Sequence, residues 1–217
     1  MNAVVGVIGC NGGVGASTLT AALAVTAPGA VLVDLDGPAG GIDVLLDCVD
    51  VPGARWSGVE VDGGELDPAA LREGLPVWRG CPVLAADRGS PGPAEVVQVL
   101  HAARHLGPVV LDLPRCGGSA RAAGVALSDL VLLLARADSC GVSAAHAAAE
   151  ALTGRPLGLV VRRHEFDPSV VQRAVGIELV GTLPPMRGAV SGDRLPRPLL
   201  RLAEGVWDGV SGRSAHD

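Results

Sequence analysis

The chain contains no lysine, and it is also poor in aromatic residues. All 17 basic residues are arginines, and with 23 acidic residues the net charge is −6 at neutral pH. Aromatic residues make up only 2% of the 217 residues. Nucleic-acid binding draws on basic patches that neutralise phosphates, and single strands also need aromatic rings on which bases stack. The composition therefore argues against a nucleic-acid partner.

The chain also lacks the patterns of disulfide-rich, zinc-binding and membrane-spanning proteins. Its five cysteines are scattered and include no C-x-x-C pair, which argues against a disulfide framework or a zinc site. No uninterrupted apolar run reaches the roughly 20 residues that cross a bilayer. The first residues do not resemble a signal peptide. We therefore expect reduced thiols and a cytoplasmic protein.

Short Val/Leu-rich runs alternate with Ala-rich helical stretches along the chain. This alternation predicts an α/β fold with a mostly parallel β-sheet flanked by helices on both faces. We expect a single domain over residues 1–210, an irregular stretch over 50–79 and a polar tail over 211–217. The expected strands are Val4–Ile8, Ala30–Asp34, Val83–Ala86, Val109–Leu113, Leu130–Ala135, Leu157–Val161 and Leu179–Thr182. The expected helices are Ser17–Thr26, Ile42–Leu46, Pro93–His105, Ser119–Leu127, Ala144–Leu152, Pro168–Ala174 and Leu199–Val210.

A glycine-rich loop joins the first expected strand to the first expected helix. Residues 9–18 read GCNGGVGAST, close to the phosphate-binding pattern G-x-x-x-x-G-K-S/T, whose backbone amides cradle phosphates at a helix N-terminus. Ala16 stands where that pattern has its lysine. The loop thus keeps the backbone cradle and lacks the cation. The candidate phosphate-binding residues are Asn11, Gly12, Gly13, Val14, Gly15, Ala16, Ser17 and Thr18.

Acidic residues mark the ends of two expected strands. Asp34 and Asp36 follow the second strand, and Asp112 lies near the end of the fourth. The carboxyl ends of parallel strands form the edge where open α/β sheets bind ligands. Carboxylates beside the Ser17 hydroxyl could hold Mg²⁺ and orient an attacking water. We take Ser17 and Asp112 as candidate Mg²⁺ ligands, Asp36 and Asp112 as candidate catalytic residues, and Asp34 as structural.

Together these motifs resemble the MinD/ParA family of deviant Walker ATPases, which belong to the SIMIBI-type P-loop proteins. Residues 11–18 match the family's loop, K-G-G-x-G-K-S/T-T, except at its two lysines. Residues 34–43 resemble its switch I, residues 112–114 its Walker B and switch II, and residues 181–184 its strand and turn near the adenine. This last match makes Pro184 a candidate nucleotide contact. The matches run in the family's order from residue 4 to about residue 185.

Within that family the chain most resembles CpaE/TadZ-like septum site-determining proteins of high-G+C bacteria, on residues 12–17, 111–115 and 133–138. Such proteins often carry an N-terminal receiver-like domain, which we expect this chain to lack. The resemblance implies ATP and Mg²⁺ as ligands, a homodimer, and protein partners in division or pilus and secretion machinery. It implies a positioning factor in septum-site determination or Tad-type pilus assembly, placed at poles or septa through partners.

The departures from the family pattern lower the expected activity. Asn11 replaces a lysine that in relatives reaches the partner's phosphates across the dimer, and Ala16 replaces the lysine that acts within the same chain. We therefore expect weak or absent ATP hydrolysis. An alternative is a working ATP-dependent switch in which Arg115, or as second choice Arg121, supplies the missing charge. A ParA-like role in DNA partitioning is less expected because the chain is acidic.

Four further features have competing interpretations. His101 and His105 are four residues apart on an expected helix, and we favour a solvated face over a metal site because no third ligand accompanies them. Cys10 lies near a helix N-terminus, which is expected to lower its pKa; it is either a redox-sensitive thiol or a small packing residue. The apolar face of the last helix favours core or dimer packing over membrane docking, which needs more basic residues. Arg162 stands where many relatives have an adenine-reading asparagine.

Overall fold

The computed structural model describes residues 2–37, 41–59, 65–87, 91–185 and 195–214. These residues form an eight-stranded sheet in the order β3-β4-β2-β5-β1-β6-β7-β8. The pairing of β3 with β4 is antiparallel, and the other pairings are parallel. The strands are β1 (Val4–Gly9), β2 (Val31–Asp34), β3 (Val77–Trp78), β4 (Cys81–Leu84), β5 (Val109–Leu113), β6 (Leu130–Arg136), β7 (Leu157–Arg162) and β8 (Leu179–Leu183).

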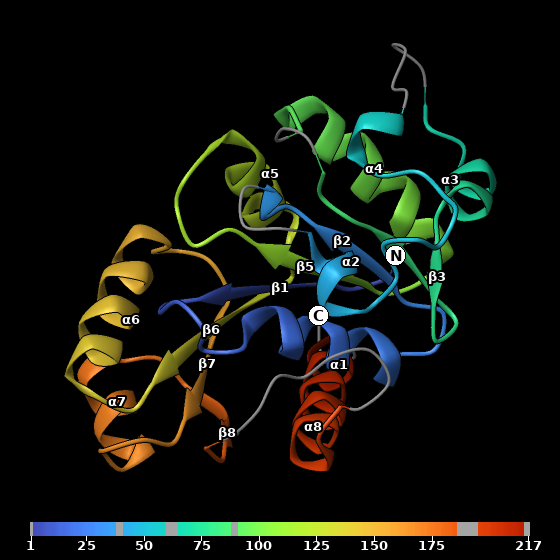
Figure 1. Cartoon of the computed structure of the whole chain (residues 1–217). Coiled ribbons are helices and arrows are strands. Elements are labelled where there is room, and N and C mark those ends of the chain that lie inside the picture. Colours follow the sequence, from blue (N-terminus) through green and yellow to red (C-terminus); the bar gives the residue numbers. More distant parts are fainter. Residues whose placement is uncertain (1, 38–40, 60–64, 88–90, 186–194, 215–217) are drawn as a thin grey trace.

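Helices cover both faces of this sheet (Figure 1). One buried cluster joins the sheet to α3, α4, α5, α6 and α7, and a second joins the opposite face to α1, α2 and α8. The predicted α/β fold with a mostly parallel sheet is therefore confirmed. The helices are α1 (Ala16–Thr26), α2 (Ile42–Leu45), α3 (Pro68–Gly74), α4 (Pro93–Leu106), α5 (Ser119–Leu127), α6 (Ser139–Ala151), α7 (Pro168–Val175) and α8 (Arg197–Ser214), with a 3-10 turn at Trp56–Gly58.

The central strands are apolar along their whole length because both of their faces are buried. In β1, Val4 and Ile8 contribute to one cluster and Val5 and Val7 to the other, which is the two-residue alternation of a strand. Such continuous apolar runs are typical of parallel sheets covered by helices. The register pairs Val7 with Asp112, so the loop after β1 and Asp112 of β5 lie at the same edge of the sheet.

Besides the 3-10 turn, the described part of the stretch 50–79 contains α3 and β3, so the irregular prediction was wrong in part. Helix α3 begins with Pro68 behind Asp67, whose side chain accepts hydrogen bonds from the Ala69 and Ala70 amides at 3.3 Å. Aspartate followed by proline is a strong helix-start signal that the glycine-rich context obscured. Strand β3 has only two residues and depends on antiparallel pairing with β4, so no local period reveals it.

Other boundaries also differ from the expected ones. Helix α6 begins at Ser139 rather than at Ala144, because the Asp138 side chain caps it by accepting from the Gly141 amide at 2.7 Å. Strand β4 occupies Cys81–Leu84, two residues before the expected run. Helix α8 continues to Ser214 and includes the first four residues of the expected polar tail; residues 215–217 lie outside the described part.

Helix α8 packs against α1 on the sheet face opposite to α4 and α5 (Figure 1). Its apolar residues are buried there, and the Trp207 indole N–H donates to the Leu23 carbonyl at 3.0 Å. This apolar face therefore serves the core, one of the two packing roles expected for it. Among the described residues, no helix combines the length and apolar character that a membrane span requires. The buried residues are Leu199, Ala203, Val206 and Val210.

We predict opposite effects of two glycine-to-alanine substitutions inside helices. A Cβ at Gly141 would lie 1.8 Å from the Arg136 carbonyl oxygen, whereas a Cβ at Gly209 meets no atom within 4 Å. Gly141→Ala should lower the free energy of unfolding by about 2 kcal/mol or more, because the backbone must shift. Gly209→Ala should raise it by about 0.5–1 kcal/mol, because alanine favours the helix. Urea unfolding followed by circular dichroism measures both, and equal effects would contradict the packing described around Gly141.

Candidate functional site

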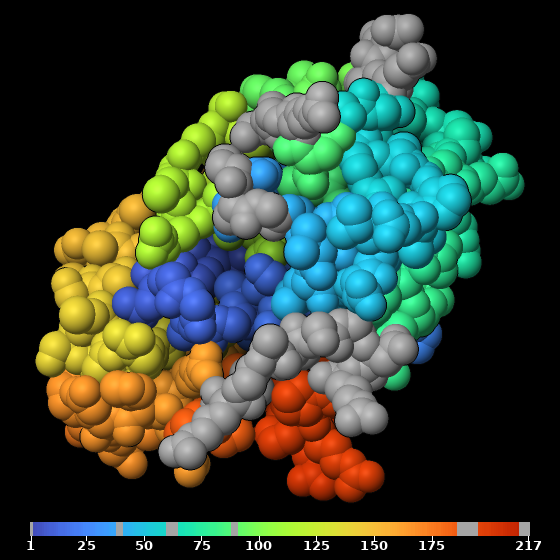
Figure 2. Space-filling model, viewed as in Figure 1, coloured from blue at the N-terminus to red at the C-terminus, as the bar shows by residue number. Residues whose placement is uncertain are grey.

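A cavity of about 880 Å³ lies at the carboxyl ends of β1, β2 and β5. Its described lining comes from three segments: the loop 9–18, the segment that follows β2, and residues 112–121. Figure 2 shows the blue loop between the yellow-green segment after β5 and the light-blue segment after β2. The sequence therefore predicted correctly which three segments meet at this edge of the sheet.

Backbone geometry turns the glycine-rich loop back onto the start of α1. Gly13 and Gly15 have φ values of 67° and 101°, a left-handed conformation that side-chain-bearing residues rarely adopt. The Cys10 amide donates to the Leu134 carbonyl of β6 at 2.9 Å, which fixes where the loop leaves the sheet. No side chain caps α1, and the first amides of any helix lack intrahelical partners. The loop and the helix start thus present N–H groups suited to an anion.

Two side-chain contacts attach this loop to the β6–β7 side of the sheet. The Asn11 side-chain oxygen accepts from the Arg136 amide at 3.4 Å. Arg162, the last residue of β7, donates from Nη1 to the carbonyl oxygens of Gly13 and Val14, each at 3.2 Å. The sequence did not predict these contacts, because they join positions more than 120 residues apart.

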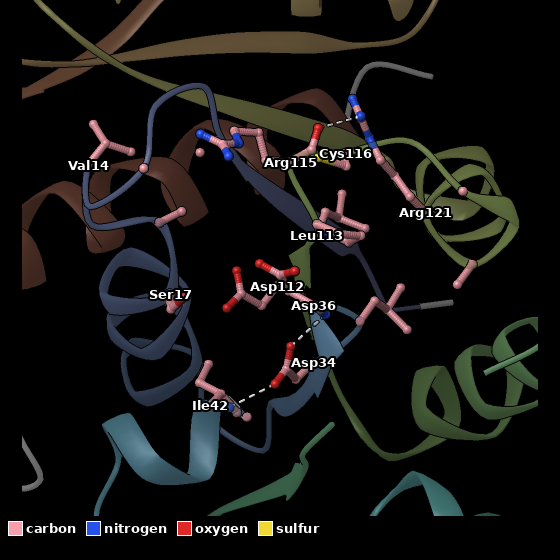
Figure 3. A pocket seen from close by; sticks show the side chains of 18 of the residues that line it. Val14, Ser17, Asp34, Asp36, Ile42, Asp112, Leu113, Arg115, Cys116 and Arg121 are labelled. Atoms are coloured by element: carbon pink, nitrogen blue, oxygen red, sulfur yellow. Dashed lines mark hydrogen bonds between the residues drawn. The ribbon is translucent and has the colours of Figure 1, made fainter. Parts of the chain in front are cut away.

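Asp34 organises the segment that follows β2. Its buried carboxylate accepts from the amides of Asp36 and Ile42, both at 2.8 Å (Figure 3). It also accepts from the Ala86 amide at 3.3 Å. The Trp56 indole donates to the Asp34 carbonyl at 2.7 Å. The structural role expected for Asp34 agrees with these contacts, because all the carboxylate's bonds are to backbone.

Arg55 holds the same segment from its far end, a role that no sequence signal indicated. Its Nε forms an ion pair with Asp43 at 3.0 Å, and both side chains are largely buried. Its Nη2 donates to the carbonyls of Cys48 and Val49, each at 3.1 Å. Because α2 carries residues of the cavity wall, Arg55 and Asp34 together set the position of that wall.

Asp112 is, with Asp34, one of two buried carboxyl groups that line the cavity. It is 4% exposed and accepts a hydrogen bond from the Thr20 hydroxyl at 3.4 Å. Ser17, in the first turn of α1, lines the same cavity. Burial, and after it the charge of Asp34, raise the pKa of Asp112 to about 8, although the Ser17 and Thr20 hydroxyls oppose the shift. Burial also raises the pKa of Asp34, which is the register partner of Asp112 on β2.

The donor set around Ser17 and Asp112 fits a magnesium ion that also binds phosphate. A cation would favour the ionised form of Asp112 that burial disfavours. Within the described ranges, no group of three or more histidine, cysteine or acidic side chains is arranged for a metal ion. Mg²⁺ usually keeps waters and takes one or two protein ligands plus substrate phosphates, so this pair is sufficient. Asp36 is half-buried and lines the same cavity.

Two arginines approach the cavity from the segment after β5 (Figure 3). Arg115 Nη1 lies 3.6 Å from the position of a Cβ built on Gly12, so its guanidinium is next to the loop. Arg121 donates from Nη1 to the Arg115 carbonyl at 2.8 Å and thereby holds the backbone of that residue. Ala16 also lines the cavity but brings no charge. The two predicted substitute cations are thus both at the site, with Arg115 nearer the loop.

The expected lowering of the Cys10 pKa was wrong. Cys10 is only 6% exposed, and burial raises the pKa of its thiol to about 12 against the opposing charge of Arg121. Proximity to a helix N-terminus does not compensate for loss of solvent. Of the two interpretations, the small packing residue fits this environment.

Pro184 follows β8 and does not belong to the described lining of the cavity, so its role as a nucleotide contact stays a prediction. His101 and His105 are both exposed on α4. Their position agrees with the solvated helix face that was favoured over a metal site.

Comparison with known proteins identifies relatives by sequence and by structure. The chain is 44% identical over 167 residues to an uncharacterized protein found in two strains of Mycobacterium tuberculosis. The match covers 74% of this chain and 47% of that protein, so the chain spans about half the length of the curated relatives it matches. A scan against models of protein families finds none that matches.

Solved structures that resemble the chain include MinD cell division proteins and a ParA family ATPase. The cell division ATPase MinD of Pyrococcus furiosus superposes with a TM-score of 0.72 at 16% identity, over 96% of this chain and 99% of that one. MinD of Pyrococcus horikoshii, solved with Mg-ADP, gives 0.70 at 16% identity over 98% of each chain. The chain has a MinD/ParA-like P-loop ATPase fold. A ParA family ATPase of Chlorobium tepidum gives 0.69 at 14% identity, over 96% and 93% of the two chains.

We predict that Asp112 makes the stability of the metal-free protein depend on pH. Its pKa is raised from 3.8 to about 8, so in this window the folded state binds more protons than the unfolded state and stability falls as pH rises. Asp112→Asn removes this component, which amounts to at most about 1.4 kcal/mol per pH unit. The free energy of unfolding of the variant minus that of the wild type should therefore increase from about pH 5 to about pH 8. Urea unfolding with a chelator measures it, and a pH-independent difference would contradict the assignment.

Proposed function

We propose that this chain is a MinD/ParA-type positioning factor with a degenerate P-loop and weak or absent ATP hydrolysis. One observation carries the proposal: the loop keeps its backbone cradle and the Ser17–Asp112 pair, while Asn11 and Ala16 stand at the two lysine positions. The architecture for an anion and Mg²⁺ is therefore present without the charges that drive phosphoryl transfer. Its setting would be septum-site determination or Tad-type pilus and secretion assembly.

Binding of a nucleotide is supported by the cavity and its donors. Loop amides, the start of α1, Arg115 and the Ser17–Asp112 pair would contact a phosphate chain with Mg²⁺. The Pyrococcus horikoshii MinD structure holds Mg-ADP in the same fold. Loss of one buried charge partner costs about 2–5 kcal/mol, or roughly 30-fold to several thousand-fold in affinity. We therefore propose ATP with Mg²⁺ as a weakly bound ligand.

Weak hydrolysis follows from the position of Asn11 as well as from its lack of charge. Its side-chain oxygen is used within its own chain, by the Arg136 amide. A cation supplied in trans is worth about 10³–10⁵ in rate in related phosphoryl transfer. An amide turned toward β6 does not replace it. Asp36 and Asp112 remain the proposed catalytic residues for whatever turnover exists.

The proposed partners are a second copy of the chain and proteins of division or pilus machinery. A solved complex of MinC with MinD from Aquifex aeolicus has a similar MinD-type chain, with a TM-score of 0.68 at 14% identity. A nucleic-acid partner is not proposed, because the net charge is −6 and phosphate neutralisation supplies most non-specific affinity. Membrane docking through α8 is not proposed either, since its apolar residues pack on α1. The proposed location is the cytoplasm, with polar or septal placement through partners.

A second candidate is a working ATP-dependent switch in which Arg115 replaces the missing lysine. The observation that favours it is the Arg115 guanidinium beside Gly12, on a backbone held by Arg121. Arginine binds phosphate well because its planar fork donates to two oxygens at once. The two candidates predict different affinities for ATP and different rates of ATP turnover, so a measurement of either quantity distinguishes them.

Restoring the lysine should restore nucleotide affinity. We predict that Ala16→Lys binds Mg-ATP at least about 30-fold more tightly than the wild type, because the added ammonium neutralises phosphate charge in the cavity. Ala16→Met adds similar length without charge and should bring no gain. Isothermal titration calorimetry measures all three proteins. Tight binding by the wild type that Arg115→Ala abolishes would favour the second candidate, and no binding by any protein would remove nucleotide from the proposal.

Phosphate release separates the candidates independently of affinity. We predict that saturated wild-type protein releases phosphate from ATP very slowly, at a rate close to that of Asp112→Asn, because the charges that stabilise the transition state are missing. Initial rates with Mg²⁺, measured at rising protein concentration, test this and also reveal a contribution from dimerisation. Wild-type turnover that falls in both Asp112→Asn and Arg115→Ala would establish the switch.

A further inference from the structure

We propose that Arg162 is a positioning residue that holds the phosphate loop by its carbonyl groups, and that the site selects a polyphosphate chain rather than a base. The selectivity part rests on the proposed function, because it assumes a Mg²⁺-bound phosphate ligand in this cavity. The part that concerns Arg162 rests only on contacts within the ligand-free chain.

The backbone of Arg162 is held in the sheet by pairing on both sides. Arg162 ends β7, where it is the register partner of Arg136 on β6 and of Leu183 on β8. From there its Nη1 donates to the carbonyls of Gly13 and Val14, each at 3.2 Å. Hydrogen bonds from a charged donor are shorter and stronger than neutral ones. A strand buried between two neighbours therefore restrains the middle of a glycine-rich loop.

Holding these carbonyls also orients the amides of the loop. In a trans peptide the C=O and N–H groups point in opposite directions. The Val14 carbonyl shares its peptide plane with the Gly15 amide, so that amide points away from Arg162. Gly15 lines the cavity and is the N-cap residue of α1. Gly13 and Gly15, at φ 67° and 101°, would be flexible in an unrestrained loop. Because Arg162 restrains the loop, the loop loses less conformational entropy when an anion binds.

Arg162 stands at the position where many members of the MinD/ParA family have an asparagine that contacts the adenine. In this chain its side chain contacts the phosphate loop instead. The described wall of the cavity comes from the loop 9–18, from residues within 34–36 and 41–45, and from 112–121, and none of its described residues belongs to β7, β8 or α8. Amides, the Arg115 guanidinium and the Ser17–Asp112 pair all suit phosphate and Mg²⁺. Discrimination between bases requires polar groups matched to base edges, and these segments place phosphate-binding groups instead.

Competition calorimetry tests the selectivity. The wild-type chain and Ala16→Lys are titrated in Mg²⁺ with ATP, GTP, inorganic triphosphate and AMP. We expect the three triphosphates to bind within about threefold of one another, a difference smaller than one well-formed base contact provides. AMP, which lacks the phosphate chain, should not compete. ATP binding that is tighter than both GTP and triphosphate by more than about tenfold would overturn the selectivity.

Variants of Arg162 distinguish loop holding from base reading. Arg162→Ala should weaken ATP and inorganic triphosphate by the same factor, about tenfold, and Arg162→Lys should recover part of both. Arg163→Ala is the matched control, because Arg163 is the exposed neighbour and should change neither affinity. If Arg162→Ala weakens ATP alone, Arg162 contacts the base and the proposal fails.

Hydrogen exchange of the ligand-free proteins gives a readout that does not depend on binding. Arg162→Ala should speed exchange of the amides in residues 10–18 and leave α4 unchanged, whereas Arg163→Ala should change neither. Unchanged exchange in the loop would overturn the positioning role. Absence of all binding, in both the wild type and Ala16→Lys, would overturn the proposed function together with the selectivity, and loop exchange would still decide the role of Arg162.

Discussion

The parallel register of β1, β5 and β2 is the constraint on which the candidate site depends. It pairs Val7 with Asp112 and Asp112 with Asp34, so the loop and both acids leave the sheet at one edge. Continuous apolar strands make this register stable, because helices bury both faces of the sheet. Helix α1 is packed between the sheet and α8, and its N-terminus is therefore aimed into the cavity.

The charges of the site are arranged unlike those of a lysine-bearing P-loop. The neighbouring carboxyl groups of Asp34 and Asp112 are buried together, and burial raises the pKa of both. A bound cation would stabilise their ionised forms. Positive charge comes from arginines on other segments: Arg115 beside the loop and Arg162 behind it. Arg162 binds carbonyl oxygens, so its charge supports the loop's shape. The chain thus combines a well-held phosphate cradle with little charge directed at the phosphates.

The sequence predicted the main elements closely where burial produces a regular local pattern. Val109–Leu113 and Ser119–Leu127 agree with the structure at both ends, because continuous apolar runs and helical spacing are local signals. The same reasoning missed α3 and the first turns of α6, where an aspartate cap outweighs nearby glycines. It also misjudged Cys10, because a helix N-terminus is visible in the sequence whereas the depth of burial is not. The loop residues and the acids lie at the sheet edge where the sequence placed them, because each lies at or beside the end of a strand.

The amino-acid order by itself determined the strand–loop–helix motif, the uncharged residues at the two lysine positions and the acids at the strand ends. These are local properties, because each is set by residues that are close together in the sequence. Only the tertiary structure decided that Arg162 contacts the loop, that Arg55 holds the wall after β2, and that Asp112 is buried enough to hold a proton near neutral pH. The reason is physical: a long arginine side chain can reach many partners, and the pKa of a carboxyl group depends on everything packed around it.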